Sequence, residues 1–214
     1  KMAIDNGSTD AMISYSNILH HGFGVEINYE ESIKYTGNDS IWREVNTAFQ
    51  WMPIASVISN KIFCVHGGLS PDLISPQQLN GLKRPMATYD QIVSDVLWSD
   101  PFLTDKDYIR SQRGSGVQFG PSAVFKFLDD TNLDYIFRAH QCVPLGVSKF
   151  ADNLLYTVFS SSNYEDAGSN RAGLLFVNLR NEIQAFSLPP NSIVKRSDTL
   201  FVNNKITCKG GVYS

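Results

Sequence analysis

The sequence has no apolar run that approaches the roughly 20 residues a helix needs to cross a bilayer. Its first ten residues, KMAIDNGSTD, contain no basic segment followed by an apolar one, so no secretory signal peptide is visible. It also has no excess of positive charge, because 18 Lys and Arg against 21 Asp and Glu give a net charge of −3 at pH 7. An anionic chain is not attracted to nucleic acid or to an acidic membrane surface. We therefore expect no membrane span and no nucleic-acid partner.

Cysteine is scarce, with only Cys64, Cys142 and Cys208 in the chain. An odd number of cysteines leaves a free thiol, and two of the three lie within or beside apolar segments. This pattern is typical of buried free thiols in a reducing compartment. We therefore expect a cytoplasmic or nuclear protein.

The remaining composition is that of an ordinary globular protein, with 43% hydrophobic and 18% charged residues among 214. Such a length accommodates one sizeable core, or one domain with a tail. Residues 1–20 are weakly patterned and form a lead-in, residues 21–190 carry the patterned domain, and residues 191–214 form a polar tail. Because the chain begins with Lys1, we expect it to be part of something longer.

The pattern of apolar residues predicts a mixture of helices and strands. Ser40 is a plausible N-cap for a helix that Pro53 ends, and Asn60 can take a positive φ in a hairpin turn. Because several later strands follow one another through short turns, we expect an α+β protein with an antiparallel sheet or sandwich. The further helices are expected at 77–82, at 89–96 and from Pro121 on, and the strands at 54–58, 62–65, 133–137, 147–150, 155–160, 174–179 and 182–188.

Two of the four histidines stand at the ends of predicted strands. His66 follows the strand at 62–65 and precedes Gly67 and Gly68, while His140 follows the strand at 133–137 and precedes a loop. Strand ends are rigid and adjoin loops that can approach a ligand, and neutral imidazole is the commonest metal ligand. The alternative for each residue is a capping or core histidine.

Three other residues stand out in loops: Asp100 in LWSDP, Arg113 in RGSGVQFG and Tyr164 in SSSNYE. An arginine that must reach an anionic group often precedes a glycine-rich stretch of this kind. Taken singly, each has a simpler interpretation. Asp100 is then a turn former, Arg113 a surface charge and Tyr164 a core aromatic residue.

The ordered set FCVHGGLSPDL, LWSDP, RGSGVQFG, RAHQ and SSSNYE is similar to the motifs of the phosphoprotein phosphatase family. These serine/threonine phosphatases include type 1, type 2A, calcineurin and type 5 enzymes and belong to the calcineurin-like metallophosphoesterase superfamily. The resemblance covers residues 21–190, and the loop NYEDAGSNRAG looks more like the calcineurin, type 5 and retinal-degeneration-C branches. It implies a metallophosphatase-type β-sandwich flanked by helices, and a C-terminal part of the catalytic domain whose N-terminal half is missing.

The resemblance also implies a mechanism and a set of roles. The family uses two divalent cations, manganese, iron or zinc, bridged by a water that attacks phosphoserine or phosphothreonine without a phosphoenzyme. His66 and His140 match two metal ligands, Arg113 an arginine that holds phosphate oxygens, Tyr164 a tyrosine over the groove and Asp100 an acidic residue lining it. Its members act on phosphoprotein substrates and bind regulatory subunits.

The sequence departs from the family pattern in its first part. The motifs GDxHG, GDxVDRG and GNHE, which supply the family's other metal ligands, do not occur. Two imidazoles alone cannot hold two cations against water, so we expect the chain to bind at most one transition-metal ion, weakly, and to be inactive alone. We also expect an exposed sheet edge and exposed apolar surface.

Two other functions remain open at this point. The chain could be a real short protein, a non-catalytic phosphatase-like interaction module that retains half of the groove. A metallophosphoesterase that acts on small phosphoesters or nucleotides is a third interpretation. The motif series favours a metal-dependent serine/threonine protein phosphatase.

Overall fold

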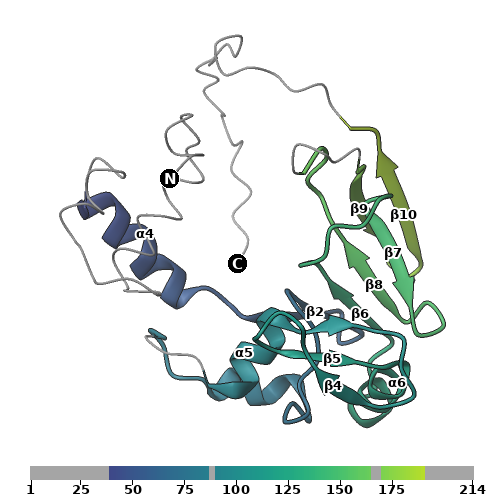
Figure 1. Cartoon of the computed structure of the whole chain (residues 1–214), viewed down its shortest axis with the longest axis horizontal. Coiled ribbons are helices and arrows are strands. Elements are labelled where there is room, and N and C mark those ends of the chain that lie inside the picture. Colours follow the sequence, from purple (N-terminus) through teal and green to yellow (C-terminus); the bar gives the residue numbers. More distant parts are fainter. Residues whose placement is uncertain (1–38, 87–89, 165–169, 191–214) are drawn as a thin grey trace.

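The structure is a computed structural model, and it describes residues 39–86, 90–164 and 170–190 (Figure 1). The predicted lead-in at 1–20 and tail at 191–214 lie outside the described residues. The helices are α4 (Asp39–Trp51), the 3-10 helix η1 (Pro76–Gly81), α5 (Gln91–Trp98) and α6 (Pro121–Thr131). The strands are β1 (Ala55–Ile58), β2 (Ile62–Val65), β3 (Asp100–Pro101), β4 (Tyr108–Arg110), β5 (Val117–Phe119), β6 (Tyr135–Arg138), β7 (Val147–Phe150), β8 (Leu155–Val158), β9 (Ala172–Val177) and β10 (Ile183–Leu188).

The α+β class is confirmed. Among the described residues, no helix combines the length and the apolar character needed to cross a membrane.

The central sheet has five strands in the order β1-β2-β6-β8-β7. The β1–β2 and β7–β8 pairs are antiparallel, but β2 pairs with β6, and β6 with β8, in parallel. The expectation of an antiparallel sheet is therefore wrong for its middle. Short turns dictate antiparallel pairing only between consecutive strands, whereas the long connection from β2 to β6 contains α5 and α6 and allows a parallel return.

Two smaller sheets lie in the described part of the chain. β9 and β10 pair antiparallel, and Figure 1 shows them beside β7 and β8. A backbone bridge joins them, because Phe159 donates to the Gly146 carbonyl at 2.8 Å and Gly173 donates to the Phe159 carbonyl at 2.8 Å. The third sheet, β3-β5-β4, was not predicted. Its strands have two or three residues, which is too few to show a periodicity of two.

The β1–β2 hairpin forms as the sequence predicts. Ser59 and Asn60 have φ values of 53° and 54°, and Lys61 donates its N–H to the Ile58 carbonyl at 2.9 Å. The same Lys61 fixes the start of β6, because its carbonyl accepts the Asp134 N–H at 2.7 Å and its ammonium pairs with the Asp134 carboxylate at 3.0 Å. The hairpin therefore sets the register between β2 and β6.

The core lies between the central sheet and α6. The apolar residues Val124, Phe127 and Leu128 of α6 are buried, and the ring centroid of Phe127 lies 5.3 Å from that of Phe63 in β2. The largest fully buried apolar side chains are Phe63, Phe119, Ile62, Leu69, Ile136, Leu155, Val93, Val96 and Val124. Burial of this set anchors β2 and β6, the strands that lead to the two histidines.

The N-terminal elements are less covered. α4 stands apart from the strands in Figure 1, and its apolar residues Val45 and Phe49 are exposed, at 43% and 59%. Val57 and Ile58 of β1 are exposed as well. Within the described residues, β1 pairs with β2 and has no strand on its other side. The expectation of exposed apolar surface is thus confirmed, and among the described residues the central sheet ends at β1. α4 already includes Ser40, so the expectation that Ser40 is its N-cap is wrong.

The cysteines differ from the expectation in one respect. Cys64 and Cys142 are both free, as predicted, but Cys64 is half-buried and Cys142 is exposed. Burial raises the pKa of the Cys64 thiol. Cys142 lies in the loop after β6. Cys208 lies outside the described residues.

Gly67 and Gly68 hold the turn after β2 against the end of α5. Both donate their N–H groups to the Val96 carbonyl, at 2.8 and 3.2 Å. A Cβ placed on Gly67 would stand 2.5 Å from the Leu97 carbonyl carbon, which is backbone that cannot swing away. Close packing of two backbones is thus the reason for a glycine here.

We expect Gly67→Ala to lower the free energy of unfolding by about 1–3 kcal/mol, the usual cost of forcing extra volume into packed structure. Gly81→Ala is the matched control, because no atom lies within 4 Å of a Cβ added at that position. Urea denaturation of both variants measures the difference. Equal stability of the two variants would contradict the packing role of Gly67.

Candidate active site

The two predicted histidines meet at one edge of the central sheet. β2 and β6 are parallel neighbours, with Cys64 opposite Phe137, so their carboxyl ends lie side by side. His66 and His140 follow those ends, and their ring centroids are 5.0 Å apart. The Ala139 N–H donates to the His66 carbonyl at 3.0 Å, which ties the two turns together. The two imidazoles therefore lie together at the carboxyl ends of β2 and β6.

His140 is held in an unusual backbone conformation. Its φ of 59° lies in the left-handed region, which costs a non-glycine residue roughly 1–2 kcal/mol. The Trp98 ring contacts the imidazole edge-on, with centroids 5.4 Å apart. Within the part of the chain that the structure describes, the buried Nε2 of His140 has no hydrogen-bond partner. A buried polar atom without a partner and a strained backbone together mark this histidine as a candidate ligand.

Both imidazoles are neutral at pH 7. Burial lowers the pKa of His140 to about 4; Asp100 opposes that shift, while Arg113, Arg138 and His66 add to it. Burial also lowers the pKa of His66, with Arg138 as a further cause. Because a lowered pKa leaves the ring unprotonated at neutral pH, each imidazole keeps a lone pair that a metal ion can take.

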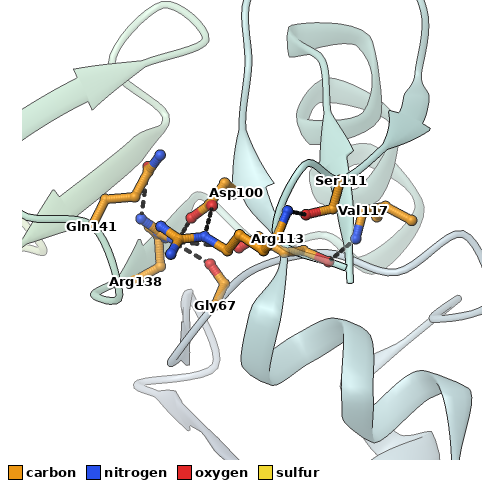
Figure 2. Close-up of polar contacts among 8 residues, drawn as sticks. Gly67, Asp100, Ser111, Arg113, Val117, Arg138 and Gln141 are labelled. Atoms are coloured by element: carbon orange, nitrogen blue, oxygen red, sulfur yellow. Dashed lines mark hydrogen bonds and ion pairs between the residues drawn. The ribbon is translucent and has the colours of Figure 1, made fainter. Parts of the chain in front are cut away.

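A buried ion-pair cluster lies beside the histidines, and Figure 2 shows Asp100 between two guanidinium groups. Asp100 Oδ1 accepts from Arg138 Nη2 at 2.7 Å, and Oδ2 accepts from Arg113 Nε at 2.5 Å. Arg138 also donates from Nε to the Gly67 carbonyl at 2.6 Å, from Nη2 to the Ser99 carbonyl at 3.1 Å and from Nη1 to Gln141 at 3.0 Å. The predicted residues Asp100 and Arg113 therefore belong to the neighbourhood of the histidines.

Arg138 was missed by sequence reasoning, although it lies in the motif RAHQ. Burial lowers the pKa of its guanidinium to about 10, and the Asp100 carboxylate opposes that shift, so the side chain stays charged at neutral pH. An arginine in the last position of a strand gives no periodic signal of its own. Only the position next but one to His140 could have pointed to it.

Arg113 is placed by the loop between β4 and β5. Its N–H donates to the Ser111 hydroxyl at 3.1 Å, and at the loop's far end Val117 donates to the Ser99 hydroxyl at 3.0 Å. Gly116, with a φ of 69°, comes so close to Trp98 that a Cβ there would lie 2.7 Å from its carbonyl carbon. The glycine-rich stretch thus lets the loop fold against LWSDP and brings Arg113 to Asp100.

Tyr164 is held by contacts with Phe159 and Asn170. Its ring packs edge-on against Phe159 with centroids 5.0 Å apart, and its N–H donates to the Asn170 side chain at 2.9 Å. The side chain is half exposed, which contradicts the alternative of a core aromatic residue. These contacts connect Tyr164 to Phe159, which follows β8, and to Asn170, which precedes β9.

The residues present fit part of a metal centre. The two neutral imidazoles and the unpaired Nε2 of His140 are suitable donors. Across residues 39–86, 90–164 and 170–190, no cluster of three or more His, Cys, Asp or Glu could hold a metal ion. The carboxylate of Asp100, which influences both imidazoles electrostatically, is engaged by two arginines. The described chain therefore offers two nitrogen ligands and no carboxylate.

The strain at His140 predicts a difference between two variants. His140→Ala and His140→Gly both remove the imidazole, but only glycine adopts a φ of 59° without cost. We expect His140→Gly to be more stable than His140→Ala by about 1 kcal/mol in urea denaturation. Equal stabilities, or a more stable alanine variant, would show that the backbone there is unstrained.

Comparisons with known proteins agree with this geometry. The family described as calcineurin-like phosphoesterase matches residues 20–144. A protein phosphatase 2A catalytic subunit of Dictyostelium discoideum is 33% identical over 181 residues, which cover 83% of this chain and 58% of that protein. Serine/threonine-protein phosphatase 4 catalytic subunit of Kluyveromyces lactis is 38% identical over 148 residues, which cover 69% of this chain and 48% of that protein.

A solved structure is similar as well. It is a protein serine/threonine phosphatase from Saccharomyces cerevisiae with similarity to human phosphatase PP5. Its TM-score is 0.67 at 27% identity, and the match covers 78% of this chain and 56% of that one. The chain thus spans about half the length of the relatives it matches. It belongs to the calcineurin-like phosphoesterase family, within the phosphoprotein phosphatase group of serine/threonine phosphatases.

Proposed function

We propose that this chain carries the C-terminal part of the active site of a metal-dependent serine/threonine protein phosphatase. The observation that carries the proposal is the imidazole pair, His66 and His140, with the unpaired Nε2 of His140 beside the Arg113–Asp100–Arg138 cluster. The reaction is hydrolysis of phosphoserine or phosphothreonine. Phosphoprotein substrates and regulatory subunits are proposed on the strength of the related catalytic subunits.

The proposed roles follow from the contacts of each side chain. His66 and His140 would hold a divalent ion, manganese, iron or zinc, through their neutral nitrogens. Metal ions bound there would lower the pKa of a coordinated water and polarise phosphoryl oxygens. Arg113 would bind phosphate oxygens with the guanidinium nitrogens that Asp100 does not use, and Tyr164 would border the groove.

The proposal assigns the remaining ligands to a polypeptide segment with GDxHG, GDxVDRG and GNHE. None of these motifs occurs in the 214 residues, and the relatives are about twice as long as the matched region. A centre of two dications needs carboxylates to offset their repulsion. The described chain by itself is therefore proposed to bind at most one ion, and to need such a segment for turnover.

Titration with Mn²⁺ tests the ligand pair. We expect one weak site in the wild-type chain and no detectable site in His66→Ala or His140→Ala, because each variant leaves a single nitrogen donor. Cys142→Ser is the control, since its thiol is exposed and free and could bind metal adventitiously. Isothermal titration calorimetry measures all four proteins. Two tight sites, or tight binding that survives His66→Ala, would contradict the assignment.

Turnover is tested with manganese on a phosphopeptide and on p-nitrophenyl phosphate. We expect no turnover by the chain alone, and turnover of the phosphopeptide when a segment with the three motifs is co-expressed with it. Arg113→Ala in that complex should reduce kcat/KM by about 10–100-fold, the loss expected for one charge-assisted phosphate contact. Robust turnover by the chain alone would refute the claim that ligands are lacking.

A non-catalytic interaction module is the second candidate. The observations in its favour are the lack of the three motifs and the exposed apolar surface of α4 and β1. If the complex with the added segment stays inactive while the chain still binds a phosphopeptide, this candidate replaces the first. Faster turnover of an added nucleotide than of the phosphopeptide would instead indicate an enzyme that acts on small phosphoesters.

For its location we propose the cytoplasm or the nucleus. The support is that Cys64 and Cys142 are both free, and that Cys142 is exposed. An exposed free thiol persists in a reducing compartment. Microscopy of a tagged chain tests this location.

A further inference from the structure

We infer that Arg138 and Asp100 are positioning residues, a buried ion pair whose task is to aim the guanidinium of Arg113 at a phosphate-type anion beside His66 and His140. The inference rests on the proposed function, because it explains how the proposed phosphate-binding arginine is held. It also changes the role of Asp100, which the sequence suggested as an acidic residue lining the groove.

The geometry of Asp100 leaves it no oxygen for substrate. One carboxylate oxygen accepts from Arg138 and the other from Arg113, and the residue is only 4% exposed. Both oxygens of the carboxylate are thus used in charge-assisted bonds to arginine. Asp100 therefore acts through its neighbours and not on the reacting atoms.

Arg138 is the fully buried residue of the Arg113–Asp100–Arg138 cluster. Its side chain is fully buried, and its donors are directed to Gly67, Ser99, Asp100 and Gln141. These partners belong to the turn after β2, to the start of β3 and to the turn after β6. One guanidinium thus links the loops that carry His66, Asp100 and His140, and a lysine could not span them with a single ammonium.

Arg113 is the partly exposed residue of the same cluster. Its side chain is 40% exposed, and Asp100 holds it through Nε alone. The cluster has two guanidinium cations and one carboxylate, so one positive charge remains, and burial of the Arg138–Asp100 pair puts that charge on Arg113. Among the described residues, its two terminal nitrogens make no hydrogen bond, and they form the fork that suits a phosphate. An arginine held by Nε presents that fork in a fixed direction.

The test measures inorganic phosphate binding to the 214-residue chain by calorimetry, at constant ionic strength because surface charges are screened by salt. Arg113→Ala should weaken binding at least about tenfold, on the scale of a lost charge-assisted bond. Arg138→Lys keeps the charge and removes the fork, and should weaken binding about tenfold, as the loss of a supporting partner usually does. Arg180→Ala, in the exposed β9–β10 turn, is the control for net charge and should leave binding unchanged.

The decisive comparison is the double variant Arg113→Ala/Arg138→Lys. If Arg138 acts through Arg113, adding Arg138→Lys to Arg113→Ala should produce no further loss of phosphate affinity. A merely structural role would lower the melting temperature and leave the affinity of the folded chain unchanged, which would overturn the inference. Additive losses of affinity, or no measurable binding by the wild-type chain, would overturn it too.

Two further measurements test the inference if the Arg138→Lys variant does not fold. Asp100→Asn/Arg138→Met removes both buried charges together, leaves no uncompensated ion, and should lose affinity to the same degree. In the wild-type chain, side-chain NMR of Arg113 should show the Nη resonances shifting with phosphate while the Nε resonance stays unchanged. A shift of Nε alone would overturn the inference. If the effects of Arg113→Ala and Arg138→Lys on phosphate affinity are non-additive but the chain binds no Mn²⁺, this inference stands while the proposed function fails.

Discussion

The parallel pairing of β2 with β6 is the constraint on which the candidate site depends. Because the two strands run in the same direction, their last residues stand at one edge of the sheet, and the ring centroids of His66 and His140 come within 5.0 Å of each other. Lys61 and Asp134 fix the start of that pairing, and the buried side chains of Phe63 and Ile136 hold its middle. Antiparallel pairing would have sent the two histidines to opposite ends. The chemistry proposed for this chain therefore follows from strand direction.

Much of this arrangement could be predicted from the sequence. The β1–β2 hairpin and the strand at 147–150 were predicted because turn residues and short apolar segments are local properties of the sequence. The pairing of the two histidines was suggested by their equivalent positions at strand ends. The parallel direction was not predictable in this way, because it depends on the packing of α6 against β2, a contact between residues far apart in the sequence. Similarly, α4 has a clear apolar face, yet nothing in the described residues buries it.

The cluster of Asp100, Arg113 and Arg138 shows the limit of prediction from motifs. The sequence suggested Asp100 and Arg113 as separate groove residues, whereas the structure joins them through one carboxylate and adds Arg138, which had no role assigned. A buried charge needs a partner of opposite charge, and that partner can lie far away in the sequence, as Asp100 does from Arg138. The left-handed backbone of His140 was equally hidden, because that conformation is uncommon for any residue other than glycine and no local pattern in the sequence announces it.

The central claim is that this chain supplies two nitrogen ligands of a phosphatase metal centre. Pulsed EPR of the chain loaded with one equivalent of Cu²⁺ tests it most directly, because nitrogen couplings identify and count the coordinated imidazoles. The account predicts couplings from two imidazoles, reduced to one in His66→Ala and likewise in His140→Ala. Coupling from no imidazole, or a signal of two imidazoles that both single variants leave intact, would contradict it.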